Sequence, residues 1–341
     1  MKKIGFYNYY DSYNNNRMFD PNFLSDIGND LSYPFKLLAS ELKNKGFEVS
    51  TIDTQPLDEY DAIFFLDFPT CKNRYFQELV RKKTDNLFLF IFENELIRPD
   101  NWDRKNYHFF RKVFSWNDNF VDNEKVFKFF LPNRLLGRIS IDPAKKTKWC
   151  CLIAGNKSSP HKKELYTERI KAIRWFESNA PGSFDLYGQG WDIHPFSGVL
   201  RPLNRVRLMT RLFAPRFPSF KGSITSKHEV LEQYKFSICY ENARDIPGYI
   251  TEKIFDCFFA GCIPVYWGAS NITQYIPENT FIDRRKFDSY KQLYDFMVKM
   301  DDLTYLDYVH NIETFVSGPE ISPFSADNFC ATILRLINEG S

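Results

Sequence analysis

Glu252 and Lys253 stand where a βαβ unit would bind an anion. Residues 234–240 show an alternating pattern expected of a strand, residues 252–259 carry apolar side chains at helical spacing, and residues 263–267 are typical of a further strand. The loop after the first strand of such a unit opens at the carboxyl edge of the sheet, where open α/β folds bind ligands. The next helix directs its free amide groups and positive dipole end to the same place. The spacing therefore indicates an anion site.

Both residues also have an ordinary interpretation. A carboxylate in the first helical turn, such as Glu252, is favourable helix chemistry, whereas a cation there opposes the dipole unless an anion lies between. Lys253 could equally be a solvated surface residue, and the spacing alone leaves both interpretations open. The loop lacks the G-x-G-x-x-G and G-x-x-x-x-G-K patterns, so neither a generic dinucleotide site nor an ATP site is indicated.

Two series of expected strands and helices position these residues. The first series contains a helix at residues 34–45 and strands at residues 3–9, 47–52, 62–66 and 87–92. The second begins near Lys148 and contains, ahead of the βαβ unit, a helix at residues 164–177 and strands at residues 149–154 and 184–186. Strands that alternate with helices predict parallel βαβ units and hence an α/β fold.

The size of the chain favours two domains. Its 341 residues, 43% of them apolar, exceed the usual size of one compact domain. A stretch with prolines and Gly137 separates the two series, and we place the boundary there, which gives domains of residues 1–142 and 143–341. The 45 basic and 43 acidic side chains nearly cancel, so the overall charge attracts neither nucleic acid nor an anionic membrane.

The sequence predicts a cytoplasmic location, with membrane contact that is at most peripheral. Polar residues interrupt the N-terminal apolar stretch before a signal segment could form, and no window approaches the roughly 18 to 20 apolar residues that a bilayer demands. The seven cysteines include no C-x-x-C pair and mostly lie in apolar runs, which favours buried free thiols over bridges or metal ligands.

Residues 192–222 are unusual because they combine several prolines with five arginines. The prolines favour an irregular connection over a helix. A substrate loop and a solvated linker are both open interpretations of this stretch.

A long match to a known family begins at Tyr234. From there the chain reads YKFSICYENARDIPGYITEKIFDCFFAGCIPVYWGASNITQYIPENTFID. It resembles the donor-binding signature of the α-1,3/1,4-fucosyltransferase family, glycosyltransferase family 10, and is most similar to its soluble bacterial members. The core of that signature runs roughly Y-K-F, F-E-N, G-Y-x-T-E-K and P-V-Y-x-G. Weaker similarity extends to LYTERIKAIRWFE with FDLYGQGW, and to FIFENELIRPDNW.

The resemblance implies a glycosyltransferase-B type α/β fold, in which two Rossmann-like domains face a cleft. Residues 1–142 would bind the acceptor, and residues 143–341 the donor, guanosine diphosphate-fucose (GDP-fucose). By the same resemblance, Glu252 would hold the ribose hydroxyls, and Lys253 and Arg169 would neutralise the diphosphate. Asn242 and Tyr249 would line the donor pocket. Fixed cations suit this reaction because the departing diphosphate gains charge in the transition state.

The implied activity is an inverting fucosyl transfer, which needs a base on the acceptor side. Glu93 follows the expected strand at residues 87–92 and is our candidate for the base. Glu95 lies two residues on in the same loop, and the register leaves both open; either could also be an ordinary loop carboxylate. We expect no metal and no further cofactor, because Asp283 has no second aspartate at D-x-D spacing and Asp301-Asp302 lies outside a strand end.

The expected partners are GDP-fucose and a glycan acceptor, such as an N-acetyllactosamine-type or polysaccharide unit, with O3 of an N-acetylglucosamine-type residue as the attacking group. No nucleic acid partner is expected. Two alternatives remain: a transferase of the same fold with another nucleotide sugar, because a fold does not select the sugar, and a non-catalytic carbohydrate-binding protein with aromatic side chains at its surface.

Overall fold

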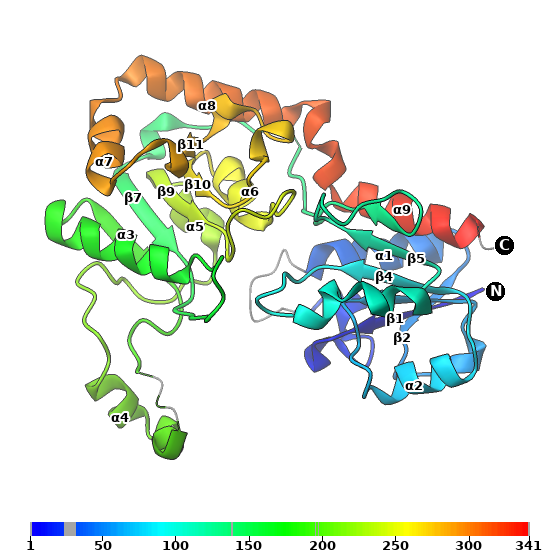
Figure 1. The fold of residues 1–341 in the computed structure, drawn as a ribbon. Helices are drawn as coiled ribbons and strands as arrows, with labels where there is room; N and C mark the ends of the chain where they lie inside the picture. Colours follow the sequence, from blue (N-terminus) through cyan, green and yellow to red (C-terminus); the bar gives the residue numbers. More distant parts are fainter. Residues whose placement is uncertain (1, 24–31, 138, 195, 197, 340–341) are drawn as a thin grey trace. The chain divides into compact units, whose positions relative to one another are not determined.

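The computed structural model describes residues 2–23, 32–137, 139–194, 196 and 198–339. They form two compact units (Figure 1). Unit 1 is drawn from Met1–Leu136, Ile246–Glu252 and Pro319–Ser341, and unit 2 from Gly137–Asp245 and Lys253–Gly318.

This division differs from the expected single boundary after residue 142. The chain passes from unit 1 to unit 2 between Leu136 and Gly137. Two segments that the sequence placed in the second domain, residues 246–252 and 319–341, belong to unit 1 instead. The second of these segments carries the last helix, and the apolar face of that helix is buried on the sheet of unit 1.

Unit 1 is built on a parallel sheet in the order β2-β1-β3-β4-β5-β6. Its strands are β1 (Lys3–Asn8), β2 (Glu48–Thr51), β3 (Ala62–Leu66), β4 (Leu87–Ile91), β5 (Lys112–Ser115) and β6 (Val126–Lys128). Ile4 of β1 pairs with Val49 on one side and with Ala62 on the other. Every residue of β3 and β4 is buried, as is typical of parallel strands that are covered on both faces.

Stacked phenylalanines join neighbouring strands of this sheet. The ring centroids of Phe6 and Phe64 lie 5.2 Å apart, those of Phe64 and Phe88 4.9 Å, and those of Phe90 and Phe114 4.4 Å. A shift of one residue in any strand would turn these side chains to the opposite face, so the stacks help to fix the register.

Helices cover both faces of the unit 1 sheet. On one face lie α1 (Tyr33–Asn44) and α9 (Ala326–Glu339), which pack side by side although they come from opposite ends of the chain (Figure 1). Phe329 of α9 belongs to the same buried cluster as the rings on β1 and β3. On the other face α2 (Arg74–Arg81) contributes Phe76 to a second cluster.

Unit 2 is built on a parallel sheet in the order β11-β10-β9-β7-β8. Its strands are β7 (Lys148–Ile153), β8 (Phe184–Tyr187), β9 (Tyr234–Tyr240), β10 (Ile263–Trp267) and β11 (Ile282–Asp283). Its α-helices are α3 (Tyr166–Asn179), α4 (Arg207–Leu212), α5 (Lys227–Leu231), α7 (Tyr290–Lys299), α8 (Asp302–Ser317) and α6 (Glu252–Phe259), whose first residue is grouped with unit 1.

The two sheets have the same connectivity. In each, the second strand in sequence flanks the first on one side, and the third flanks the first on the other side. The first strands are β1 and β7, so the direction in which the sheet grows reverses between β1 and β3 in unit 1 and between β7 and β9 in unit 2. Such a reversal opens a crevice at the carboxyl ends of the two strands, where ligands of open α/β sheets bind.

The stretch at residues 192–222 is more ordered than its prolines predicted. It contains a 3-10 helical segment at Gly198–Arg205, with Pro202 inside it, followed by α4. A proline is compatible with a short 3-10 turn, in which fewer backbone amides need an internal partner than in a long α-helix.

The cysteines behave as predicted, since all seven are free and six are buried; Cys71 is exposed. Burial raises the pKa of the Cys150 and Cys330 thiols. Over the part of the chain that the structure describes, none of the helices combines the length and apolar character needed to cross a membrane.

Candidate active site

Polar side chains follow three neighbouring strands of unit 1 at the carboxyl edge of its sheet. Tyr10 lies two residues after β1, Asp67 directly follows β3, and Glu93 lies two residues after β4. The first two therefore flank the crevice between β1 and β3, and Glu93 comes from the next strand along.

Glu93, the candidate base, is held from two sides. Its Oε1 atom accepts a hydrogen bond of 2.7 Å from the Tyr10 hydroxyl, and its backbone amide donates one of 2.9 Å to Oδ1 of Asp67. Burial, followed by the charge of Glu93, raises the pKa of Tyr10, so this phenol stays protonated and acts as the donor. The Glu93 carboxylate thus has a defined orientation at the sheet edge.

Asp67 is the buried anchor of this arrangement, with 3% of its surface exposed. Its Oδ1 atom accepts hydrogen bonds from the backbone amides of Phe92 and Glu93, at 2.8 and 2.9 Å, and from the Asn101 side-chain amide at 2.7 Å. Its backbone has a left-handed φ of +70°. Burial first, and then the nearby Glu93 charge, raise the pKa of Asp67 to about 7, although the three donors oppose this shift. An uncharged Asp67 does not repel a negative charge on Glu93.

Arg98 fixes the loop that follows Glu93. The Arg98 guanidinium, 3% exposed, donates hydrogen bonds of 2.9 and 2.7 Å to the two carboxylate oxygens of Asp100 and a further one to the Phe68 carbonyl oxygen. The same guanidinium lies 3.7 Å from the centroid of the Tyr9 ring. Tyr9 and Tyr10 therefore present two partly exposed rings beside Glu93, at an anchored surface.

Tyr249, predicted to line the donor pocket, is buried within unit 1. Its hydroxyl accepts a hydrogen bond of 2.5 Å from the Asn94 side-chain amide, and its ring centroid lies 4.6 Å from that of Trp116. The structure thus brings the Glu93 loop and the G-Y-x-T-E motif together, although 155 positions separate Asn94 from Tyr249.

Gly248 allows this approach. Its φ is +78°, and a Cβ atom there would lie 2.2 Å from the Trp116 carbonyl oxygen and under 3 Å from the Lys128 and Asp118 side chains. The adjacent Pro247 carbonyl oxygen accepts a hydrogen bond of 3.2 Å from the Asp118 amide. Only glycine combines the left-handed backbone with so close a contact.

In unit 2, Arg169 binds the carboxyl end of β9. The residue projects from α3 and is 4% exposed. Its guanidinium donates hydrogen bonds to the carbonyl oxygens of Tyr240, at 2.6 Å, and Glu241, at 2.9 Å, and to the Asn242 side-chain oxygen, at 3.1 Å. The structure therefore brings together two predicted donor-binding residues, Arg169 and Asn242, at the reversal between β7 and β9.

Lys253 is neither a solvated surface residue nor remote from this edge. Its ammonium nitrogen lies 3.3 Å from the Glu241 carboxylate, and the two side chains are 22% and 0% exposed. Lys253 lies in the first turn of α6, and Glu241 directly follows β9. The pairing neutralises a buried carboxylate and places a cation at a helix N-terminus, where an anionic ligand is favoured.

Glu95 and Glu252 are the two remaining predicted site residues. Glu95, the alternative base, is half-buried in the loop after β4, and Glu252, expected to hold the ribose, is half-buried at the start of α6. The roles proposed for both residues remain predictions.

The sequence reasoning missed Tyr10, Asp67 and Asn94. The signal was present for Asp67, because the strand at residues 62–66 was expected and a carboxylate directly follows it. Applying the strand-end argument to every expected strand, rather than to two, would have found Asp67 and the Tyr9-Tyr10 pair.

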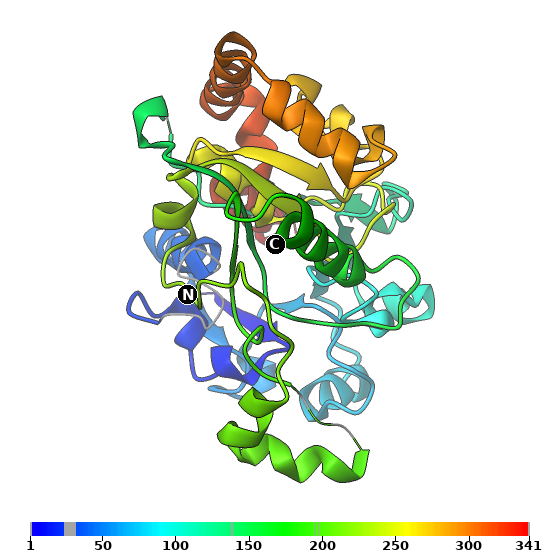
Figure 2. The same ribbon diagram turned by 90° about the vertical axis from the view of Figure 1, so that its left-hand side faces the viewer.

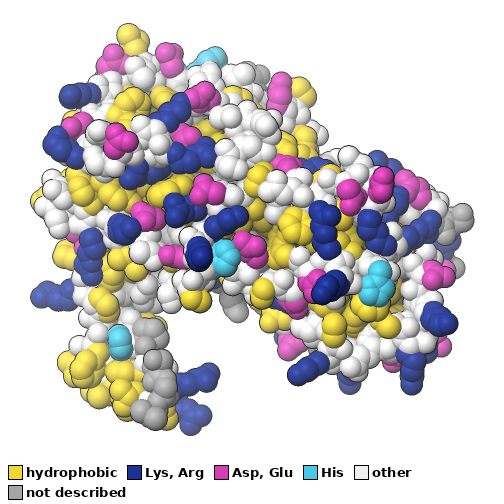
Figure 3. Space-filling model, viewed as in Figure 1, with side chains coloured by type: hydrophobic (Ala, Val, Ile, Leu, Met, Phe, Trp, Pro, Cys, Tyr) yellow, Lys and Arg dark blue, Asp and Glu magenta, His cyan; other side chains and the backbone are white. Residues whose placement is uncertain are grey.

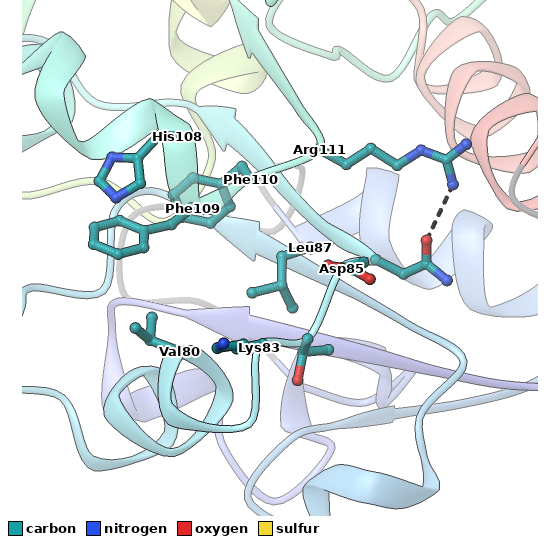
Figure 4. A pocket seen from close by; sticks show the side chains of 10 residues that line it. Val80, Lys83, Asp85, Leu87, His108, Phe109, Phe110 and Arg111 are labelled. Atoms are coloured by element: carbon teal, nitrogen blue, oxygen red, sulfur yellow. Dashed lines mark hydrogen bonds between the residues drawn. The ribbon is translucent and has the colours of Figure 1, made fainter.

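A cavity of about 480 Å³ lies elsewhere in unit 1 (Figure 4). Asn86 and Leu87 at the start of β4, and Phe110 and Arg111 just before β5, contribute to its lining. These positions are at the amino edge of the sheet, opposite Glu93. The Arg111 guanidinium is already bound to the Asn86 side-chain oxygen at 3.0 Å, as the dashed line in Figure 4 shows. We therefore do not assign this cavity to the active site.

Within the described ranges, no three His, Cys, Asp or Glu side chains come together as a metal site would require.

Solved structures with the same fold are glycosyltransferases. A crystal structure of an alpha-1,3-fucosyltransferase matches with a TM-score of 0.62 and 15% identity, over 99% of this chain and 90% of that one. A crystal structure of alpha-1,3-fucosyltransferase with GDP-fucose gives a TM-score of 0.57 and 15% identity, over 98% of this chain and 90% of that one. This likeness confirms the predicted glycosyltransferase-B type fold of two Rossmann-like domains.

The family follows from the sequence. Residues 143–339, more than half of the chain, match the profile of glycosyltransferase family 10 (fucosyltransferase), C-terminal part. The chain belongs to glycosyltransferase family 10, as the resemblance implied.

Curated relatives match over shorter segments. The alpha-(1,3)-fucosyltransferase of Helicobacter pylori is 35% identical over 75 residues, 22% of this chain and 16% of the relative. The alpha-(1,4)-fucosyltransferase of Arabidopsis thaliana is 34% identical over 83 residues, 24% of this chain and 20% of the relative. The GDP-fucose protein O-fucosyltransferase 3 of Xenopus laevis is 36% identical over 95 residues, 27% of this chain and 20% of the relative. The matched segments thus span a fifth or less of each relative.

The buried Asp67 should make stability depend on pH. Its pKa is about 7 in the folded protein, against about 4 in an unfolded chain, so its contribution is complete below about pH 4 and is lost as the pH rises through 7. The loss is on the order of 4 kcal/mol. Asp67→Asn keeps an acceptor oxygen for the three donors, so its free energy of unfolding should rise relative to wild type between about pH 4 and pH 8.

Urea unfolding of both proteins across this pH range measures the difference. Asp58→Asn, at an exposed position, controls for the introduction of an amide. Parallel pH profiles for wild type and Asp67→Asn would contradict the assignment.

Gly248→Ala should destabilise unit 1 by more than the backbone strain alone. The left-handed φ costs about 1 kcal/mol for alanine, and the contact with the Trp116 carbonyl adds to it, for a total of roughly 3 kcal/mol. Gly46→Ala is the matched control, because Gly46 has a φ of +80° with nothing within 4 Å of its added Cβ. Thermal unfolding of the two variants compares them directly; equal midpoints would show that the close contact is unimportant.

Proposed function

We propose that this protein is an inverting fucosyltransferase, which transfers L-fucose from GDP-fucose to a hydroxyl group of a glycan. The observation that carries the proposal is the family 10 match over residues 143–339, which includes Arg169, Asn242, Tyr249, Glu252 and Lys253. A solved alpha-1,3-fucosyltransferase structure of the same fold contains GDP-fucose. In the proposal, the candidate residues of unit 1 supply the base, and those of unit 2 bind the donor.

Unit 2 is the proposed donor-binding unit. Lys253 at the start of α6 and Arg169 on α3 lie at the carboxyl edge of the sheet, and Asn242 is fixed by Arg169. In the proposal, Lys253 and the amide groups of the α6 N-terminus neutralise the diphosphate. Arg169 is proposed to help neutralise the diphosphate, and its contacts with two carbonyl oxygens also suit it to shape the β9 loop around the nucleotide. Glu252 would hold the ribose.

Unit 1 is the proposed acceptor-binding unit, with Glu93 as the base. Tyr10 binds Oε1 of Glu93, so that Oε2 is the oxygen proposed to receive the acceptor hydroxyl. Tyr9 and Tyr10, 40% and 38% exposed, offer aromatic rings on which a sugar can stack. Asp67 accepts a hydrogen bond from the Glu93 backbone amide, and while it is uncharged it does not repel the Glu93 carboxylate.

The proposed reaction is a single displacement. The acceptor oxygen forms a bond to the anomeric carbon while the bond from that carbon to the β-phosphate oxygen breaks, and GDP leaves with the electron pair. The acceptor proton passes to Glu93. The β-linked donor becomes an α-linked fucoside through a transition state with oxocarbenium character. Charge develops on the departing phosphate, where fixed cations lower the barrier. We propose that Lys253 and the helix N-terminus do this without a metal ion.

The acceptor is proposed to be an N-acetyllactosamine-type or polysaccharide unit, attacked through O3 of an N-acetylglucosamine-type residue. The relatives differ on this point, since their names include alpha-(1,3), alpha-(1,4) and protein O-fucosyl transfer. A donor other than GDP-fucose is the competing possibility, because a solved structure of the same fold, an alpha-glucosyltransferase with a TM-score of 0.55, contains UDP.

The donor can be identified by thermal shift. GDP-fucose and GDP should raise the unfolding midpoint, and UDP-sugars should not. Lys253→Met should weaken the GDP response about tenfold in half-saturating concentration, because it removes a charge-assisted contact to phosphate. Lys227→Met is the matched control: Lys227 also pairs with a carboxylate, Asp256 at 2.7 Å, but lies on α5. A response to UDP-sugars alone would exclude fucose as the transferred sugar.

Replacement of the base should stop transfer and spare donor binding. Glu93→Gln keeps an acceptor for the Tyr10 hydroxyl, and kcat should fall by roughly 100-fold to 10,000-fold, while the affinity for GDP-fucose stays within about twofold. Fucose transfer to N-acetyllactosamine and GDP binding measure the two quantities. Glu95→Gln is the control from the same loop. If only Glu95→Gln lost turnover, the base would be Glu95.

A further inference from the structure

Residues 198–216, called the arm here, protrude from unit 2. The arm consists of the 3-10 segment Gly198–Arg205, α4 and the turn after α4. In Figures 1 and 2 it projects away from the sheet of its unit at the end of two connecting segments. Neither the proposed donor site nor the proposed base uses any residue of the arm.

The base of the arm is firmly attached. Trp191, 2% exposed, donates a hydrogen bond of 2.7 Å from its indole nitrogen to the Ala154 carbonyl oxygen, and its ring packs against Phe217 at 5.0 Å. The Leu186 amide donates to the Ser219 carbonyl oxygen at 2.9 Å. The arm is therefore a built protrusion that is anchored where it leaves the sheet.

The arm also has internal packing. The Phe196 and Phe213 rings meet edge to face at 5.8 Å, and the His194 amide donates a hydrogen bond of 2.7 Å to the Thr210 carbonyl oxygen. The Asn204 side chain bonds the backbone amide and carbonyl of Phe196 at 2.8 and 2.9 Å. These contacts give the arm a defined shape, which a solvated linker would not need.

Its large apolar side chains nevertheless face outward. Five of the thirteen exposed large hydrophobic residues in the described chain lie in the arm: Leu200 (52%), Val206 (48%), Leu208 (74%), Leu212 (70%) and Phe213 (55%). Leu208 and Leu212 are four residues apart on α4 and so share one face. Figure 3 shows hydrophobic side chains gathered on this protrusion, with basic side chains at its edge. Exposed apolar residues clustered in this way indicate a surface that another apolar phase covers.

The charge of the arm selects the partner. Five arginines and no acidic residue occur in residues 198–216, a net charge of +5 in a chain whose total is +2. Arg201, Arg205 and Arg216 are exposed, as is Arg211. Two arms brought together would place these like charges side by side, which disfavours self-association. A bilayer with an apolar interior and anionic headgroups matches both features. Leucines can enter the acyl boundary, and arginines can bind the headgroup phosphates.

We propose that the arm docks the protein onto the surface of a bilayer containing anionic phospholipid. Leu208, Leu212 and Phe213 enter the interface, and the exposed arginines contact the headgroup phosphates. The segment lies on the surface and does not span it. This inference concerns where the protein acts and does not depend on the sugar it transfers.

Vesicle binding, measured without donor or acceptor, tests the proposal. Wild type should cosediment with vesicles of phosphatidylglycerol and phosphatidylcholine and should stay in solution with phosphatidylcholine alone. Binding should weaken with added salt. The double variant Arg201→Gln/Arg205→Gln should bind the anionic vesicles about 25-fold more weakly, at about fivefold for each arginine. The double variant Leu208→Ser/Leu212→Ser should bind at least about tenfold more weakly.

The matched control is Leu303→Ser/Leu306→Ser. These leucines of α8 are 75% and 44% exposed in the same unit, and α8 itself contains no arginine. The control should bind vesicles as wild type does. Because all the substituted side chains are exposed, each variant should keep the thermal midpoint and GDP response of wild type.

Three outcomes would overturn the proposal. The first is a wild-type protein that ignores anionic vesicles, and the second is a control that loses binding as the arm variants do. The third is an arm variant that binds vesicles normally but changes the oligomeric mass in sedimentation, or the KM for a soluble acceptor. That result would make the arm a protein contact or a substrate loop. Loss of fucose transfer from all variants would concern the proposed function and leave the vesicle result intact.

Discussion

The geometry at the sheet edge of unit 1 depends on one buried carboxyl group. Asp67 leaves β3 with a left-handed backbone and accepts three N–H donors on a single oxygen, two from the backbone after β4 and one from Asn101. A backbone that ends a buried strand has amides that must find acceptors, and Asp67 provides them. The direction in which the Glu93 side chain leaves the sheet follows from that constraint.

Unit 2 orders the corresponding loop with a hydrogen-bond donor in place of an acceptor. There the backbone groups at the end of β9 are buried carbonyl oxygens, and the Arg169 guanidinium donates hydrogen bonds to two of them and to the Asn242 side chain. Both sheets have the same strand connectivity, so in each unit the crevice lies at the carboxyl ends of the first and third strands. A buried acceptor organises one edge and a buried donor the other. In each case one buried side chain, Asp67 or Arg169, fixes the conformation of the loop that follows a strand.

Much of the fold could be predicted from the sequence, because buried parallel strands appear as continuous apolar runs. The strands at residues 62–66 and 87–91 were found almost to the residue in this way, and the strand at residues 234–240 was found by its alternating pattern. The short strands β5 and β6 were not, since runs of three or four residues carry too little pattern. The two short helices of the arm were not predicted, because its prolines favour an irregular connection, whereas a 3-10 turn accommodates a proline.

The site could be predicted less completely. Strand ends locate Glu93, and the family signature locates Lys253, but neither reveals what a side chain touches. Lys253 pairs with Glu241, twelve positions away. Tyr249 packs against Trp116, which is far from it in the sequence. Such contacts depend on the tertiary fold, and the local pattern of residues does not predict them.

The chain's repeated passage between units has a consequence for its synthesis. The core of unit 1 includes Phe329, Ile333 and Ile337 of α9, and its loops include residues 246–252. A nascent chain that has emerged only as far as residue 136 therefore holds a sheet of which one face is covered by α1 without α9. Unit 2 has all its residues once position 318 has left the ribosome, ahead of the completion of unit 1. Until α9 has been synthesised, phenylalanines of the unit 1 sheet that α9 covers stay accessible to solvent. During that time this part of the chain is the most prone to chaperone binding and to aggregation.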